Sequence, residues 1–137
     1  LEIKPCNSCW ACAKNGGHCV IDDDMKQLYA ELDRCHFLLI ATPLYYATFP
    51  AQFFAFVNRL YPYWTQKAYP KLDCAFFGVC ADSAQSFELM DRTYFSLIGE
   101  IGWRNRRVLH VPGVVKPGDM RNHPALAEAE AFGRSLT

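Results

Sequence analysis

The sequence predicts a doubly wound α/β domain, a three-layer α/β/α sandwich built on a parallel sheet. Unbroken apolar runs such as CHFLLIATP are typical of strands buried on both faces of such a sheet. Between these runs, apolar residues recur at helical spacing. The two kinds of segment alternate along all 137 residues without an internal repeat or a linker, so we expect one domain over residues 1–137.

The composition excludes several functional classes. Hydrophobic residues make up 51% of the chain and charged residues 20%, which is typical of a globular protein. The 14 basic and 14 acidic residues balance, so we expect neither a nucleic acid nor a membrane surface as partner. No apolar run approaches the roughly 18 residues of a membrane span. Seven cysteines, an odd number, with three in apolar runs, favour a reducing compartment, hence the cytoplasm.

The first elements follow a cysteine-rich loop at residues 5–19. Residues 1–5 (LEIKP) are interpreted as the end of an earlier strand. Met25, Leu28, Tyr29 and Leu32 then lie on one face of a helix, and the three preceding aspartates are expected to cap its amino end. A strand over residues 35–42 follows.

The remaining elements repeat this alternation. Apolar residues at helical spacing predict a helix over residues 50–64, with Pro50 in its first turn. We then expect a strand at 74–81, a helix at 87–102 that ends at a glycine, a strand at 107–111 and a helix at 123–136. The last helix is expected to turn these residues toward the sheet: Leu126, Ala129, Gly133 and Leu136.

The chain is also expected to lack the first strand and helix of its fold. It begins with Leu1, at what we interpret as the tail of a strand. In a doubly wound fold the first strand lies within the sheet, and its loss would leave strand edges unpaired.

The segment PCNSCWACAKNGGHC brings four thiols close together: Cys6, Cys9, Cys12 and Cys19. Structural zinc sites are usually formed by two separated C-x2-C pairs. Three thiolates at successive gaps of two residues suit a 4Fe–4S cluster, with a fourth from further along the chain. The Asn15-Gly16-Gly17 stretch can turn the chain back to deliver Cys19. Zinc and a metal-free loop remain the alternatives.

A second informative segment, Ala41 to Leu60, begins at the carboxyl end of an expected parallel strand. Ligands of open α/β sheets bind at that edge. The loop there carries two adjacent tyrosines before a helix, so it can cover the face of a heterocycle, or it can simply close a hydrophobic edge. Its residues are Pro43, Leu44, Tyr45, Tyr46 and Thr48.

Both segments together resemble the iron–sulfur flavoproteins of the NADPH-dependent FMN reductase group, which have a flavodoxin-like fold. That family shows a compact four-cysteine run, then DDM, then P-x-Y-(Y/F/W), then a helix that ends in D-R. The corresponding residues after the cysteines are Asp23, Asp24, Met25, Pro43, Tyr45, Tyr46, Asn58 and Arg59. The segment from Pro117 and Gly118 to HPALAEA also resembles the family. Asn58 replaces the usual Asp, Phe54 replaces a common Lys, and the family's phosphate-binding loop is absent.

This resemblance implies FMN at the carboxyl edge of the sheet, partly across a subunit interface, with NAD(P)H as reductant and a homodimer or homotetramer as the assembly. It places the flavin ring against the tyrosine loop. The loop after the next strand is a second candidate wall, through Ala81 and Asp82, or else a plain connection. We expect the cluster beside the flavin, on the same side of the sheet, to pass single electrons to small donors or acceptors.

Two other functions remain open at this point. A flavodoxin-like binding or regulatory module would use the cysteine loop for structural zinc, or leave it without metal. A flavin reductase without any cluster would keep the cysteines only as a remnant. Flavin absorption and iron content distinguish these possibilities.

Overall fold

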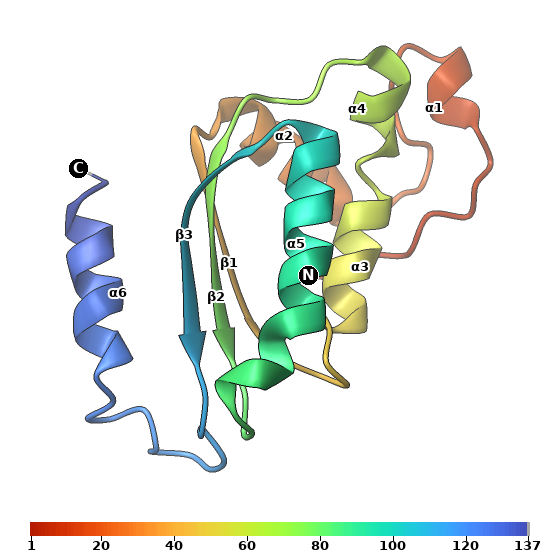
Figure 1. Cartoon of the computed structure of the whole chain (residues 1–137). Coiled ribbons are helices and arrows are strands. Elements are labelled where there is room, and N and C mark those ends of the chain that lie inside the picture. Colours follow the sequence, from red (N-terminus) through yellow and green to blue (C-terminus); the bar gives the residue numbers. More distant parts are fainter. Residues whose placement is uncertain (137) are drawn as a thin grey trace.

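A computed structural model describes residues 1–136 and shows an α/β fold around a three-stranded parallel sheet (Figure 1). The strands are β1 (Phe37–Pro43), β2 (Asp73–Val79) and β3 (Arg104–Val111), in the order β1-β2-β3. Both neighbouring pairs are parallel. The three predicted strands and their parallel arrangement are thereby confirmed, although β3 begins three residues earlier than residues 107–111.

The carboxyl ends of the strands lie level with one another. Pro43 is the register partner of Val79, and Val79 is the partner of Val111. The loops that follow the three strands therefore emerge at one edge of the sheet, where open α/β sheets bind ligands.

Helices cover both faces of the sheet and form three layers (Figure 1). One face carries α2 (Met25–Arg34), α3 (Ala51–Asn58) and α5 (Glu88–Ile101), which follows a short 3₁₀ helix, η1 (Ala84–Phe87). Their apolar faces share the main core with the sheet. The other face carries α6 (Ala125–Arg134), where Phe132 contacts Phe37 and Phe77.

The predicted helix over residues 50–64 is two helices. It divides between α3 and α4 (Tyr61–Gln66) because Pro62, in the first turn of α4, cannot continue the backbone hydrogen bonds of α3. The break leaves the carbonyl of Arg59 free to accept from the Tyr29 hydroxyl at 2.5 Å. A further short helix, α1 (Ala11–Lys14), lies within the cysteine loop and was not predicted.

Two expectations about the ends of the chain are wrong, the second only in part. Leu1–Pro5 is no strand, because the backbone amides of Glu2 and Lys4 donate to the carboxylates of Asp24 and Asp23 instead of to the sheet. Of the residues expected to face the sheet from the last helix, Ala129 does so, together with Ala125 and Phe132. Leu126 and Gly133 of α6 are exposed, as is Leu136 beyond its end.

Strand β1 is less buried than predicted. Ile40 is buried, whereas Leu39 is 47% exposed and Ala41 is exposed, because α6 covers β2 and β3 more fully than it covers β1. Within residues 1–136, β1 pairs only with β2 and its other edge is unpaired. The expected first strand stays a prediction.

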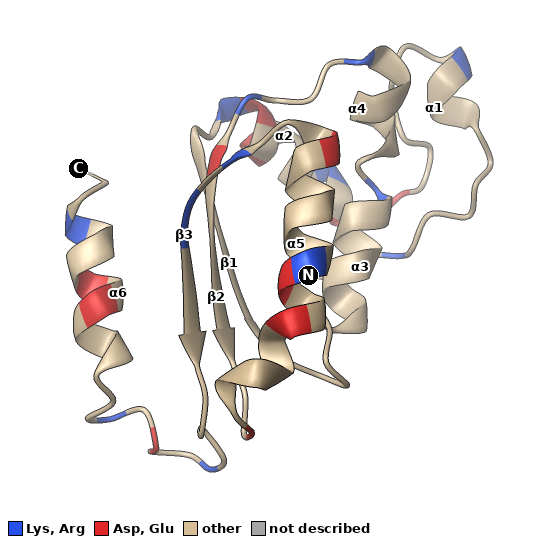
Figure 2. Ribbon diagram, viewed as in Figure 1, with Lys and Arg blue, Asp and Glu red and all other residues tan. Residues whose placement is uncertain are grey.

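Charged residues are spread over the surface (Figure 2). The basic run at the start of β3 is paired: Arg104 and Arg106 with Asp73, and Arg107 with Glu128. These arginines are therefore part of a solvated, paired charge run at the start of β3. Among residues 1–136, none of the helices has the length and apolar character needed to cross a bilayer.

Candidate functional site

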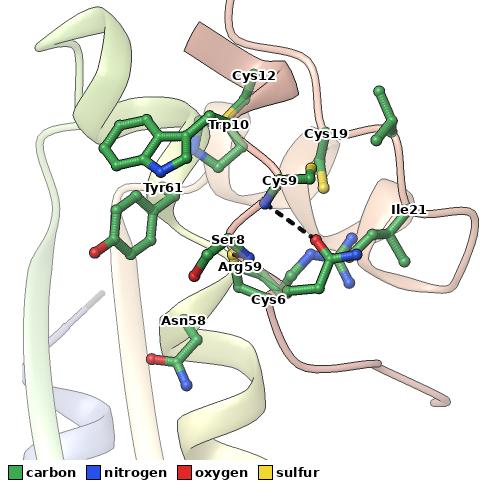
Figure 3. Close-up of a pocket in the computed structure, with 13 residues that line it drawn as sticks. Cys6, Ser8, Cys9, Trp10, Cys12, Cys19, Ile21, Asn58, Arg59 and Tyr61 are labelled. Carbon is green, nitrogen blue, oxygen red and sulfur yellow. Dashed lines mark hydrogen bonds between the residues drawn. The ribbon is translucent and has the colours of Figure 1, made fainter.

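All four cysteines of the loop line one cavity (Figure 3). The α3–α4 junction forms the inner side of this cavity, and it contributes Arg59, Tyr61 and Pro62. Cys9 is exposed, and the other three cysteines of the group are partly buried. The structure thus brings together the predicted set of thiols: Cys6, Cys9, Cys12 and Cys19.

The backbone of this loop is tightly turned. Ser8 and Trp10 have positive φ values of 57° and 58°, an uncommon conformation for residues other than glycine. Gly17 has a φ of 86°, and a Cβ there would meet Cγ of Gln66 at 2.6 Å. The predicted turn at the two glycines is therefore present, and it returns the chain so that Cys19 reaches the cavity.

The cysteine sulfurs share a cavity without converging on a point. Among the described residues, no group of three or more Cys, His, Asp or Glu side chains is placed to hold a single metal ion. Tetrahedral zinc needs all four sulfurs at about 2.3 Å from one atom. In a four-iron cluster each thiolate binds a different iron, so the sulfurs stay apart. Four thiolates around one cavity are a donor set that an iron–sulfur cluster or zinc can use.

Two backbone amides of this loop donate to nearby side chains, one of them to a sulfur. The amide of Ser8 donates to the Cys6 sulfur at 3.4 Å. Cys9 donates its amide to the Asn7 side-chain oxygen, as the dashed line in Figure 3 marks. These two short-range bonds help to hold the loop in its turned conformation.

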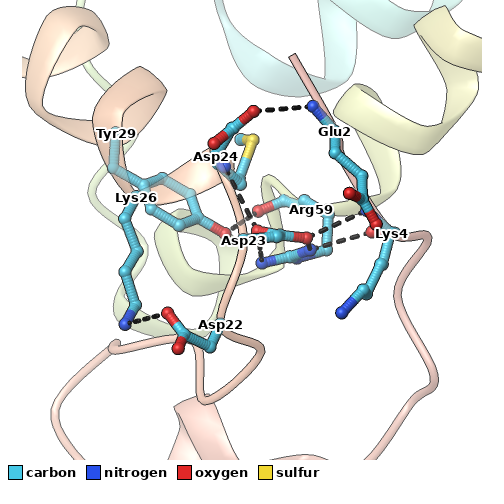
Figure 4. A network of polar contacts seen from close by, with 9 residues as sticks. Glu2, Lys4, Asp22, Asp23, Asp24, Lys26, Tyr29 and Arg59 are labelled. Atoms are coloured by element: carbon cyan, nitrogen blue, oxygen red, sulfur yellow. Dashed lines mark hydrogen bonds and ion pairs between the residues drawn. The ribbon is translucent and has the colours of Figure 1, made fainter.

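A buried ion pair supports the cavity from the core side (Figure 4). Arg59 donates to both carboxylate oxygens of Asp23, at 2.6 and 3.1 Å, and to the carbonyl of Lys4 at 2.8 Å. Asp23 also accepts the amide of Met25, so this residue, rather than Asp24, satisfies the start of α2. The pair connects the chain before the cysteine loop with α2 and the end of α3.

These contacts shift the ionisation of the groups involved. The hydrogen bonds from Arg59 lower the pKa of Asp23, more strongly than burial raises it. Burial, and then the nearby Cys19, raise the pKa of Tyr29. Asp23 is therefore anionic and Tyr29 a neutral hydroxyl at physiological pH.

An aromatic cluster flanks the same cavity. Trp10 contacts Tyr61 and Trp64 edge-on, with ring centroids 6.2 and 6.0 Å apart. These contacts hold the cysteine loop against α4. Trp10 is nevertheless 51% exposed, so it is both a packing anchor and part of the cavity rim.

The tyrosine loop forms a tight turn after β1. Tyr45 and Thr48 exchange two backbone hydrogen bonds, at 3.0 and 3.1 Å. The two residues between them, Tyr46 and Ala47, have φ values of 49° and 62°, as a type I′ turn requires. Non-glycine residues rarely accept this strain outside functional sites. The turn leaves the Tyr46 side chain completely exposed, at 102% of its reference area.

The candidate second wall lies at the same edge of the sheet. Leu44 donates its amide to the Val79 carbonyl, so the tyrosine loop begins beside the end of β2. Ala81 and Asp82 follow β2. The Ser86 hydroxyl, and then the Ser83 amide, lower the pKa of Asp82. The loop is thus a hydrogen-bonded connection that also presents a carboxylate near this edge.

The tyrosine turn and the cysteine cavity do not lie side by side, contrary to our expectation. Helix α3 begins just after the tyrosine turn, and the residue at its other end, Asn58, lines the cysteine cavity. An eight-residue helix is about 12 Å long. The error came from treating Leu1–Pro5 as a strand that would deliver the cysteine loop to the carboxyl edge of the sheet.

We did not predict from the sequence that Arg59 lines the cavity. The signal was present, because Asp23 and Arg59 both belong to the motifs that carried the family resemblance. Nothing in the sequence, however, indicated that these two motif residues pair with each other.

A model of the family described as NADPH-dependent FMN reductase matches residues 1–111. The chain is 38% identical over 58 residues to the iron-sulfur flavoprotein of Methanosarcina thermophila, covering 42% of this chain and 30% of that protein. It is 34% identical over 62 residues to the iron-sulfur flavoprotein of Archaeoglobus fulgidus, covering 45% and 28%. The matched segments span less than a third of either relative.

The fold is also similar to a solved structure described as the Trp repressor binding protein from Bacillus subtilis. The TM-score is 0.64 at 16% identity, over 77% of this chain and 72% of that one. At this identity the likeness shows a shared fold alone.

Proposed function

Because this chain belongs to the NADPH-dependent FMN reductase family, we propose that it forms part of an FMN-dependent oxidoreductase that carries a 4Fe–4S cluster. The observation that carries the proposal is the gathering of Cys6, Cys9, Cys12 and Cys19 around one cavity, in a chain similar to two iron-sulfur flavoproteins. The flavin would supply two-electron chemistry with a nicotinamide, and the cluster would supply one-electron transfer.

The flavin ring is proposed to bind at the tyrosine turn. The backbone there is held in a strained turn that keeps Tyr46 exposed, so its ring can cover a heterocycle without rearrangement. Pro43, Leu44 and Thr48 complete this wall. Ala81 and Asp82 are proposed as the opposite wall, since their loop emerges at the same edge of the sheet.

The free edge of β1 is compatible with a further strand that would bring the phosphate-binding loop to this site. A groove along that edge is lined by β1 residues and by Phe53 and Phe56 of α3. We propose that the FMN phosphate is held by such a segment outside residues 1–137. The ring contacts named above do not depend on it.

The nicotinamide and the acceptor are assigned by class only. NAD(P)H is the proposed reductant, and small electron donors or acceptors are the proposed partners, in keeping with the family. A homodimer or homotetramer is proposed. All seven cysteines are unpaired in the structure, which supports a reducing, cytoplasmic setting.

Anaerobic purification, a visible spectrum and an iron assay test this proposal. We expect flavin absorption together with iron and sulfide in equal amounts. A colourless protein containing zinc would instead support a binding or regulatory module. Flavin without iron, after anaerobic reconstitution with iron and sulfide, would support a flavin reductase that has no cluster.

A further inference from the structure

Arg59 has one buried nitrogen that the described structure leaves without any hydrogen-bond partner. A guanidinium carries five N–H groups, and those on the two terminal nitrogens bind Asp23 and the Lys4 carbonyl. Its Nε is buried and has no hydrogen-bond partner among the described residues. The side chain as a whole is 1% exposed, so solvent cannot supply the missing acceptor.

The position of Arg59 indicates where an acceptor would lie. Arg59 lines the same cavity as the four cysteines, and Figure 3 shows its guanidinium beneath Cys9 and Cys19. The other side of the guanidinium is occupied by Asp23. The cavity that Arg59 lines is therefore the space that an added acceptor for Nε could occupy, and it is lined mostly by sulfur and apolar side chains.

The ion pair fixes the direction of this donor. The two bonds to Asp23 hold the guanidinium plane, and Asp23 is held in turn by the amides of Lys4 and Met25. The Nε–H group is thus positioned in advance, before any ligand enters. Natural proteins seldom leave a buried donor without a partner, so the orphaned atom itself points to a missing ligand.

We infer that Arg59 is a positioning residue whose Nε–H donates a hydrogen bond to a sulfur of the cluster bound by the four cysteines, and that this bond raises the cluster's reduction potential. The inference rests on the proposed function. The sulfurs of such a cluster carry negative charge, and the one electron added on reduction would make the cluster as a whole more negative. A fixed donor stabilises the reduced state more than the oxidised state, and hydrogen bonds to sulfur are an established control of such potentials.

Because Arg59 and Asp23 carry opposite charges, their net charge has little effect on the proposed reduction potential. Asp23 is anionic and lies against the same guanidinium, so it offsets the positive charge of Arg59. The proposed effect therefore depends on the directed N–H group. Lysine keeps the charge but has no group equivalent to Nε–H, which makes R59K the informative variant.

The test uses protein labelled with ¹⁵N only in arginine, reconstituted anaerobically and reduced. Pulsed electron paramagnetic resonance then detects nitrogen coupled to the cluster. Among the described residues Arg59 is the only arginine that lines the cavity, so a ¹⁵N coupling would arise from it. We expect this coupling in the unaltered protein, and we expect its loss in R59K together with a more negative midpoint potential at unchanged iron content.

The matched control is R104K, on β3, where Arg104 is 72% exposed and bonded to Asp73. It should retain both the ¹⁵N coupling and the potential. Iron-loaded protein without ¹⁵N coupling would overturn the inference and leave the proposed function intact. Protein that binds no cluster at all would overturn both. If R59K loses iron, the coupling in the unaltered protein still decides the question.

Discussion

Asp23 and Arg59 form a two-pronged ion pair in which each side chain is only 1% exposed, although 36 residues separate them. The pair joins the segment after the cysteine loop to the end of α3, and it lies directly beneath the cavity. Because both charges are out of water, removal of either partner leaves the other buried without compensation.

We therefore expect D23N to destabilise the protein by about 3–5 kcal/mol at pH 7, the range for breaking a buried ion pair. Urea unfolding measures this difference. The pKa of Asp23 is lowered in the folded state, so its contribution is present above its ordinary pKa and is lost as the pH falls through the folded value. The gap between D23N and the unaltered protein should narrow below about pH 4.

The control for this prediction is D73N. Asp73 also pairs with arginines, but its side chain is 23% exposed and its arginine partners reach solvent. D73N should lower the free energy of unfolding much less than D23N does. Equal losses in the two variants would show that burial of the pair is unimportant.

Serine in place of any one of Cys6, Cys9, Cys12 or Cys19 should remove most of the bound iron. Oxygen is a weaker ligand than thiolate for this type of cluster. Iron and sulfide analysis after anaerobic reconstitution measures the loss. C35S is the matched control, since Cys35 is partly buried like three of the four but lies outside the cavity. Full iron content in all four variants would exclude these thiols as ligands.

Alanine in place of Tyr45 and Tyr46 should weaken FMN binding. Aromatic contacts contribute about 0.5–1.5 kcal/mol each, which corresponds to roughly twofold to tenfold in affinity per tyrosine. Quenching of flavin fluorescence reports the change. F95A removes another partly exposed aromatic ring, 48% exposed, from α5 and should leave the affinity unchanged. An unaltered affinity in the double variant would place the flavin elsewhere.

Gly78 of β2 is a point where the core tolerates no added atom. A Cβ there would lie 2.6 Å from Cε1 of Phe87 and 2.8 Å from Cζ of Phe76, both fully buried rings. We expect G78A to destabilise the fold by about 1–3 kcal/mol in urea unfolding. G99A, on the exposed side of α5 with nothing within 4 Å, should instead stabilise it by about 0.4–1 kcal/mol. Equal effects would contradict the close packing at Gly78.

The sequence predicted the elements whose signals are local. The apolar runs at β1, β2 and β3 and the helical spacing in α2 and α5 are properties of neighbouring residues, and the structure confirms them. The break at Pro62 and the pairing of Glu2 and Lys4 with the aspartates were missed. Both depend on which distant groups accept a hydrogen bond, which periodicity does not reveal.

The same division between local and distant signals applies to the candidate site. Cysteine spacing identified a group of thiols that do line one cavity, because the glycine turn between Cys12 and Cys19 is encoded locally. The placement of the cavity relative to the tyrosine turn was wrong, since it depends on the path of Leu1–Pro5. Arg59 could be recognised as a motif residue, but its unpaired Nε is visible only in three dimensions.

The open edge of β1 has a practical consequence for handling residues 1–137 by themselves. Among the described residues no strand pairs with β1 on that side, and the exposed Leu39 adds an apolar surface beside its backbone. Such an edge is a template on which another chain can add a strand, and repetition of that event produces aggregates. Residues 1–137 should therefore aggregate more readily as their concentration rises, and a charged residue in place of Leu39 should counteract that aggregation.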